Sequence, residues 1–203
     1  KSLDEQDYKP VELIFINDGS TDDSQQTLEH LQKEYAHVNI TIHQFDTNQG
    51  EGAARQKGLE IAAGDYIIQT DADAIFPATF VSTSVAALET TSADGGAIGR
   101  LEIHPERSGI LADYWACKRA YSYQERLANR RTKVAGIYIF KKSIAEKIGG
   151  YDASFPGGTD FDFFMRLQES QAKLVWIPDA FFYHADETRP YFFFKRLFNG
   201  GRY

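Results

Sequence analysis

The chain has 203 residues, of which 42% are hydrophobic and 25% charged, and its formal net charge is −7. This length and composition are typical of one globular domain with a substantial core. The acidic balance argues against a nucleic-acid binder, because phosphate backbones are bound by clustered cations. The single cysteine, Cys117, excludes an internal disulfide and a zinc site made of thiolates, and it suits a reducing cytoplasm.

The first predicted strand covers residues 11–16, an almost continuous apolar run of the kind found in strands buried on both faces of a parallel sheet. Asp18 follows at the carboxyl end of this strand, in a segment rich in turn-forming residues. Ser20 or Thr21 is predicted to cap the next helix, with acidic residues in its first turn. Taken alone, Asp18 is typical of a turn-forming residue.

A second strand is predicted over residues 38–45, followed by a helix over residues 48–63. Gly50 and Gly52 begin a pattern like the dinucleotide-binding fingerprint, but Arg55 occupies the position of its third glycine, so we reject that motif. Glycines at a helix start let a ligand approach closely. Arg55 lies one turn into the helix. It either reaches the edge of the sheet formed by the carboxyl ends of the strands, or it is a solvated helix residue.

A third, short strand is predicted over residues 66–68, and two carboxylates follow it, Asp71 and Asp73. Strand residues two apart point to the same side, and in open α/β sheets ligands bind at the carboxyl ends of the strands. Two converging carboxylates repel each other unless a cation lies near them. Oxygen ligands of this kind suit Mg²⁺ or Mn²⁺. An isolated Asp-x-Asp is otherwise an acidic turn.

The second half of the chain continues with helices and strands. Residues 108–133 combine tyrosines and a tryptophan with lysines and arginines, which suits sugar stacking or diphosphate binding. A helix with aromatics on one face and cations on the other explains this composition equally well. We further predict helices over 76–88 and 143–148, a polar loop over 90–96, and strands over 99–103, 134–140 and 174–177, the last ended by Pro178.

Two further segments contain candidate site residues. Asp160 stands at the head of a predicted helix, with Asp162 as a second carboxylate in the same turn. An Asp at a helix N-terminus is also simply a good cap. His184 follows a run of aromatic residues, where an isolated histidine is usually half-buried and structural.

Four motifs, at residues 16–22, 48–55, 64–73 and 157–167, together resemble the family 2 inverting glycosyltransferases of the GT-A fold. The resemblance covers nearly the whole chain. It implies an α/β fold with a mostly parallel central sheet flanked by helices. Residues 1–99 would form the nucleotide-sugar-binding half, and residues 100–203 the acceptor-binding and catalytic-base half. It also implies a first central strand outside this sequence, joined to it by a helix that ends within residues 2–8.

The resemblance implies a donor site for a nucleoside-diphosphate sugar, with a UDP-sugar favoured. Asp18 would accept a hydrogen bond from the base, and Arg55 would contact the base or a phosphate. Asp73 and His184 would bind a Mn²⁺ or Mg²⁺ ion that bridges the two phosphates. Asp71 would touch the ribose, a metal-bound water or the metal itself.

By the same resemblance, Asp160 is the base that takes the proton of an acceptor hydroxyl as the anomeric carbon is inverted. The acceptor would be a carbohydrate or a lipid-linked sugar, in cell-surface polysaccharide or glycolipid synthesis. Thr159 stands where the family has Glu, which leaves open a catalytically inactive sugar-nucleotide-binding module. A sugar-nucleotide pyrophosphorylase is a second alternative, which the segment from Asp160 to His184 fits poorly.

The location implied is the cytoplasm, including the inner face of the membrane. No apolar run approaches the roughly 20 residues of a membrane helix. The basic residues between 189 and 202 could close over a diphosphate, and the aromatic run at 191–194 could contact a membrane surface peripherally.

Overall fold

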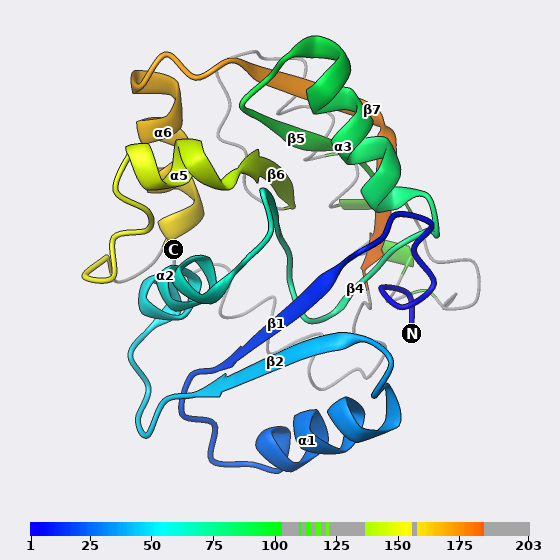
Figure 1. Ribbon diagram of the computed structural model, residues 1–203, viewed down its shortest axis with the longest axis vertical. Helices are drawn as coiled ribbons and strands as arrows, with labels where there is room; N and C mark the ends of the chain where they lie inside the picture. Colours follow the sequence, from blue (N-terminus) through cyan, green and yellow to red (C-terminus); the bar gives the residue numbers. More distant parts are fainter. Residues whose placement is uncertain are drawn as a thin grey trace.

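The computed structural model describes residues 1–102, 110, 113–114, 117–118, 121, 137–155 and 158–184. In this part of the chain helices and strands are interspersed, which confirms the predicted α/β class (Figure 1). The elements are β1 (Glu12–Asn17), α1 (Ser24–Glu34), β2 (Asn39–Gln44), α2 (Glu51–Ile61), β3 (Tyr66–Gln69), β4 (Ala74–Ile75), α3 (Phe80–Thr91), β5 (Gly95–Glu102), β6 (Tyr138–Lys141), α5 (Lys142–Lys147), α6 (Thr159–Glu169) and β7 (Leu174–His184).

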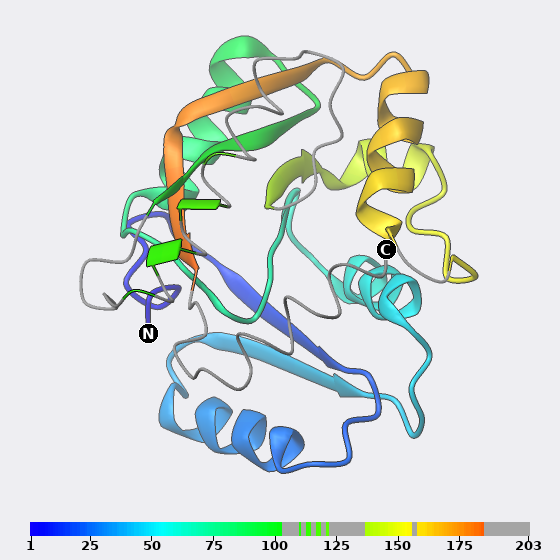
Figure 2. The ribbon, with the colours of Figure 1, turned by 180° about the vertical axis from the view of Figure 1, so that it is seen from behind.

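The described strands form two sheets. β1 and β2 pair in parallel, and the other five strands follow the order β3-β6-β5-β7-β4. The longest ladder of the second sheet, between β5 and β7, is also parallel, whereas β3–β6, β5–β6 and β4–β7 are antiparallel. Helices α1 and α2 contact the smaller sheet and α3 contacts β5 and β7, as both ribbon views show (Figures 1 and 2).

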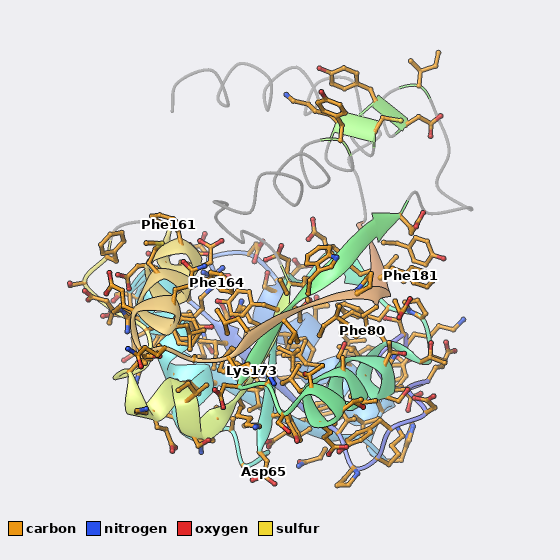
Figure 3. The ribbon with its side chains drawn as sticks, turned by 90° about the horizontal axis from the view of Figure 1, so that it is seen from above. Asp65, Phe80, Phe161, Phe164, Lys173 and Phe181 are labelled. Carbon is orange, nitrogen blue, oxygen red and sulfur yellow. The ribbon has the colours of Figure 1, made fainter. Side chains whose placement is uncertain are left out.

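Two clusters of buried side chains form the core. One lies between α3 and the strands β6 and β7, with Phe80 and Leu88 almost completely buried, and Figure 3 shows Phe80 between α3 and β7. The other joins β6, α5 and α6 around Phe163 and Leu167. The second cluster matters for function, because it sets the position of the first turn of α6.

The start of the chain packs on α3 through a buried glutamine. The Gln6 amide donates to the carbonyls of Ser2 and Pro77, and its Oε1 accepts from the backbone N–H of Val81 at 3.0 Å. Gln6 therefore satisfies one of the N–H groups left open at the N-terminus of α3. Residues 2–5 form a turn, in which the Glu5 N–H donates to the Lys1 carbonyl at 3.1 Å, and the helix predicted to end here and the additional central strand stay predictions.

Two helix starts differ from the prediction. Helix α1 begins at Ser24 after Asp23, not after Ser20 or Thr21, and no acidic residue occupies its first turn. Helix α3 begins at Phe80 instead of residue 76, because a residue that precedes a proline, as Phe76 does, is driven away from helical geometry. Both helices thus start a few residues later than predicted.

The predicted polar loop over residues 90–96 is wrong, because α3 continues to Thr91 and β5 begins at Gly95. Gly95 and Gly96, the last two residues of that range, are strand residues in a crowded place. A Cβ on Gly96 would lie 2.8 Å from Ile177 Cδ1 and 3.1 Å from the Val175 carbonyl oxygen. Glycine is required here by close packing and not by a turn.

The last strand does not end at Pro178. β7 continues to His184, and its register against β5 shifts, with Ile98 opposite Ile177 but Arg100 opposite Phe181. Proline has no N–H to donate to a ladder, so a bulge is where a strand tolerates it. This irregularity lets β7 carry His184 as far as β4.

Candidate active site

The carboxylate of Asp18 joins the loop after β1 to the start of α2. Its two oxygens accept hydrogen bonds from the backbone N–H groups of Gln49 at 2.6 Å and Gly50 at 2.9 Å. Gly19 has φ +69°, and a Cβ there would lie 2.6 Å from the backbone nitrogen of Asn48. The loop after β1 and the loop before α2 are therefore packed backbone to backbone, at the carboxyl ends of the strands, as predicted for Asp18.

Gly52, in the first turn of α2, makes room for protein rather than for a ligand. A Cβ at this position would lie 2.5 Å from the Asp152 carbonyl oxygen and 3.2 Å from Thr159 Cγ2. For Gly52 the prediction of a ligand approach is wrong, because the segment that leads into α6 fills the space. This close contact brings α2 against the N-terminal end of α6 (Figure 2).

Arg55 reaches from α2 to the first residues of α6. Its Nη1 donates to Thr159 Oγ1 at 2.7 Å and lies 3.9 Å from Asp160 Oδ1. Its Nη2 lies 2.5 Å from Glu51 Oε1, and its guanidinium carbon lies 6.0 Å from the centre of the Tyr151 ring. The side chain is only 11% exposed. The alternative of a solvated helix residue is therefore excluded.

The two carboxylates in the first turn of α6 have different partners. Asp162 accepts from Nε and Nη2 of Arg166, at 2.9 and 2.6 Å, while Arg166 Nη1 donates to the carbonyls of Ile148 and Gly150. Asp162 thus belongs to a brace that ties α6 to the turn after α5. Asp160 lies beside Arg55 instead, and it stays the predicted base.

A buried pair of tyrosines lies next to this cluster. The hydroxyls of Tyr138 and Tyr151 are 2.9 Å apart, and that of Tyr151 donates to Gln69 Oε1 at 3.5 Å, at the end of β3. The Tyr151 ring stacks on Phe163 with centroids 4.3 Å apart. Burial raises the pKa of both phenols above the ordinary value, so both are protonated at neutral pH.

Neither Tyr138 nor Gln69 was among the predicted site residues, because Tyr138 lies inside a predicted apolar strand and Gln69 directly follows another. Their polar groups meet Tyr151 only once β3 and β6 pair, with Gln69 opposite Tyr138. A tyrosine or glutamine within such a strand is the signal that could have indicated a buried polar contact.

Asp71 and Asp73 lie in the turn between β3 and β4, and both are exposed. The backbone N–H of Ala74 donates to the Asp71 carbonyl at 3.2 Å, so a turn and not strand alternation positions the two carboxylates. The reason given for their common direction is therefore wrong. β4 pairs with β7, with Ala74 opposite His184, which places the backbone of His184 beside the residue that follows Asp73.

This register suits the predicted metal ligands, since it brings a histidine of β7 to the turn that contains both carboxylates. The side chain of His184 lies outside the described part of the structure. Among the described residues, no three His, Cys, Asp or Glu side chains are grouped so as to hold a metal ion. Asp71, Asp73 and His184 therefore stay the predicted ligands.

Several predicted features lie outside the described residues. They are most of residues 108–133, the start of the strand over 134–140, and the basic and aromatic residues of 189–202. In the ranges that the structure does describe, no helix has the length and apolar character needed to cross a membrane.

The sequence profile of glycosyl transferase family 2 matches residues 1–149. An uncharacterized glycosyltransferase, YibD of Escherichia coli K12, is 38% identical over 90 residues, which are 44% of this chain and 25% of that protein. The glucosyl-dolichyl phosphate glucuronosyltransferase of Haloferax volcanii is 25% identical over 162 residues, 73% of this chain and 48% of that protein. The chain thus spans a quarter to a half of these relatives.

The mannosyltransferase PcManGT of Pyrobaculum calidifontis, solved in complex with GDP-Man and Mn²⁺, has the same fold. The TM-score is 0.73 at 19% sequence identity, and the match covers 94% of this chain and 52% of that one. The arrangement of β1 to α6 around the Asp18, Arg55 and Asp160 side chains is thus part of a fold that occurs in sugar transferases.

Proposed function

The chain belongs to glycosyl transferase family 2 and has the GT-A fold, and from this premise we propose that the protein transfers a sugar from a nucleoside-diphosphate sugar to a hydroxyl acceptor with inversion. One observation carries the proposal. Asp160, from the second half of the chain, lies beside the first turn of α2 in the donor half, 3.9 Å from Arg55. This proximity supports a single site in which a base for the acceptor lies next to the proposed donor site.

For the sugar donor, we assign Asp18 to a hydrogen bond with the nucleobase. Asp71 is assigned to the ribose, to a metal-bound water or to the metal. Asp73 and His184 are assigned to Mn²⁺ or Mg²⁺, which when bound would stabilise the charge of the leaving diphosphate. The pairing of Ala74 with His184 supports this set. The Mn²⁺ ion of the Pyrobaculum structure supports a divalent metal.

In the proposed step, the acceptor oxygen attacks the anomeric carbon while the bond from that carbon to the diphosphate oxygen breaks on the opposite face. Asp160 takes the proton of the attacking hydroxyl. One displacement inverts the anomeric centre and needs no nucleophile from the protein. The engagement of Asp162 by Arg166 supports the choice of Asp160 as the base.

For the acceptor we propose a carbohydrate or a lipid-linked sugar, in cell-surface polysaccharide or glycolipid synthesis at the inner face of the membrane. Support comes from the Haloferax relative, whose name gives a glucosyl-dolichyl phosphate as its substrate. A UDP-sugar is the favoured donor from the sequence, whereas the Pyrobaculum enzyme was solved with GDP-Man. Both nucleotides therefore belong in the test.

The test is release of nucleoside diphosphate by the full-length protein in Mn²⁺, with UDP-, GDP- and dTDP-sugars and with simple sugar and polyprenyl-phosphate sugar acceptors. We expect one donor to be turned over, with an inverted linkage in the product. Tight binding of a nucleotide without any turnover would instead favour the inactive sugar-nucleotide-binding module. Formation of a sugar nucleotide from a sugar phosphate and a nucleoside triphosphate would favour the pyrophosphorylase.

A further inference from the structure

We propose that Arg55 is a positioning residue, which holds the base Asp160 in place through the Thr159 hydroxyl. This inference rests on the proposed function. It adds a role for Arg55 in the chemical step to the predicted contact with the nucleotide, and it gives a purpose to the threonine at residue 159.

The first step of the argument is the burial of Thr159. Its side chain is 1% exposed, and a buried hydroxyl without a partner costs free energy. Arg55 Nη1 supplies that partner at 2.7 Å, from a helix 104 residues earlier in the chain. Helix α6 begins at Thr159 after Gly158, with no side-chain hydrogen bond capping its start. The bond to Arg55 is therefore a tether at the turn that contains Asp160.

The second step is that Arg55 is itself fixed. Glu51 holds Nη2 at 2.5 Å from one turn earlier in α2, and the Tyr151 ring lies beside the guanidinium. A guanidinium is planar, so fixing one edge directs the other. The directed nitrogen, Nη1, is the one that reaches both Thr159 Oγ1 and the neighbourhood of Asp160 Oδ1.

The third step concerns the chemistry of residue 159, where the resemblance led us to expect Glu. A hydroxyl accepts the hydrogen bond from Arg55 and adds no negative charge. A carboxylate at residue 159 would compete with Asp160 for the guanidinium of Arg55, and it would repel the negative charge of Asp160. Threonine therefore anchors the start of α6 without forming an ion pair, so the guanidinium of Arg55 pairs only with the carboxylates of Glu51 and Asp160 among the described residues. On this view the departure from the family pattern is compatible with catalysis.

The test compares three variants of the full-length protein. Thr159→Val keeps the shape and removes the acceptor, Thr159→Ser keeps the hydroxyl, and Arg55→Lys keeps the charge but cannot span both partners. For each we would measure kcat and KM with the donor found in the panel, the Kd of UDP in Mn²⁺ by calorimetry, and the melting temperature. If GDP or dTDP is the nucleotide of that donor, it replaces UDP.

We expect Thr159→Val and Arg55→Lys to lower kcat about tenfold or more, since displacement of a reacting group by about 1 Å costs on the order of 10²-fold. The nucleotide Kd should stay within about twofold in Thr159→Val, and Thr159→Ser should keep kcat within about threefold of the original protein. In Arg55→Lys the Kd also reports the predicted contact of Arg55 with the nucleotide, so for that variant kcat decides. A Thr159→Val variant with unchanged kcat would overturn the proposal.

Arg55→Lys provides a second, independent arm if Thr159→Val does not fold. A nucleotide Kd raised about tenfold at unchanged kcat would show that Arg55 acts on the donor alone, and would also overturn the proposal. If the unsubstituted protein neither binds a nucleotide nor turns over a donor, the proposed function fails, and this inference falls with it.

Discussion

At the scale of single residues, Asp160 and Asp162 have the same chemistry and the same helical turn, yet only one is occupied by a close cation. The guanidinium of Arg166 contacts Asp162 at 2.6 and 2.9 Å, whereas that of Arg55 stays 3.9 Å from Asp160. A carboxylate held by two charge-assisted hydrogen bonds is a structural group. The Asp160 carboxylate has no guanidinium so close, which supports it over Asp162 as the proposed base.

The pair of variants Asp160→Asn and Asp162→Asn tests this difference. We expect Asp160→Asn to lower kcat by about 10²-fold or more, with little change in melting temperature, because a general base is lost. Asp162→Asn should lower the free energy of unfolding by about 1 kcal/mol, since a partly buried ion pair is lost, and should keep most of kcat. Turnover and urea unfolding measure the two effects. The reverse pattern would identify Asp162 as the base.

The buried tyrosine pair predicts a pH dependence of stability. The folded protein raises the pKa of Tyr138 and Tyr151, chiefly by burial, above the value of about 10 that applies when unfolded. The stability that they confer is complete below pH 10 and is lost as pH rises above it, because the unfolded tyrosines ionise first.

Urea unfolding between pH 8 and 11 measures this loss. The slope of the free energy of unfolding against pH above 10 should be smaller in a variant with both Tyr138→Phe and Tyr151→Phe than in the original protein. Equal slopes would show that other groups cause the loss. Either single substitution leaves one buried hydroxyl short of its 2.9 Å partner and should cost about 1–3 kcal/mol.

At the scale of elements, β5 shows how packing overrides local preference. Its first residues, Gly95 and Gly96, are weak strand formers. They lie between β6 and β7, where Gly96 has Ile139 on one side and Val175 on the other. The burial of this site, and not its sequence, decides that the segment is a strand.

Two glycine-to-alanine substitutions test this reasoning. Gly96→Ala should lower the free energy of unfolding by about 1–3 kcal/mol, because its Cβ would meet the buried Ile177 side chain at 2.8 Å. Gly58→Ala is the matched control, in the interior of α2, where the nearest atom is Ile16 Cγ1 at 3.7 Å. Helix propensity should make it neutral or stabilising by up to about 1 kcal/mol. Urea unfolding of both variants decides, and a stable Gly96→Ala protein would contradict the account.

At the scale of the whole molecule, the proposed metal and donor sites unite segments from both halves of the chain. The carboxylates precede β4, and the histidine ends β7, which is paired with β4. Binding at such a composite site stabilises the folded state, because the unfolded chain has no site.

We therefore expect UDP with Mn²⁺ to raise the melting temperature of the full-length protein more than either alone, and Asp73→Asn to abolish the effect of Mn²⁺. Thermal unfolding with Mn²⁺, and with Ca²⁺ as a control ion, measures this. Stabilisation by UDP that is the same without metal, or in the Asp73→Asn variant, would contradict the metal assignment. If GDP or dTDP stabilises and UDP does not, the nucleotide changes and the metal site stands.

The sequence by itself determined the order and type of most elements, from apolar periodicity and turn residues that act within a few positions. It also placed Asp18 after a strand and Asp160 at a helix start. Only the tertiary structure decided the partners of the site residues: Thr159 for Arg55, 104 positions away, and Gln69 for Tyr151, 82 positions away. Local preferences fix backbone conformation, but a hydrogen bond between distant residues exists only once strands pair and helices pack. Element order was therefore predictable, whereas the bond that tethers α6 at Asp160 was not.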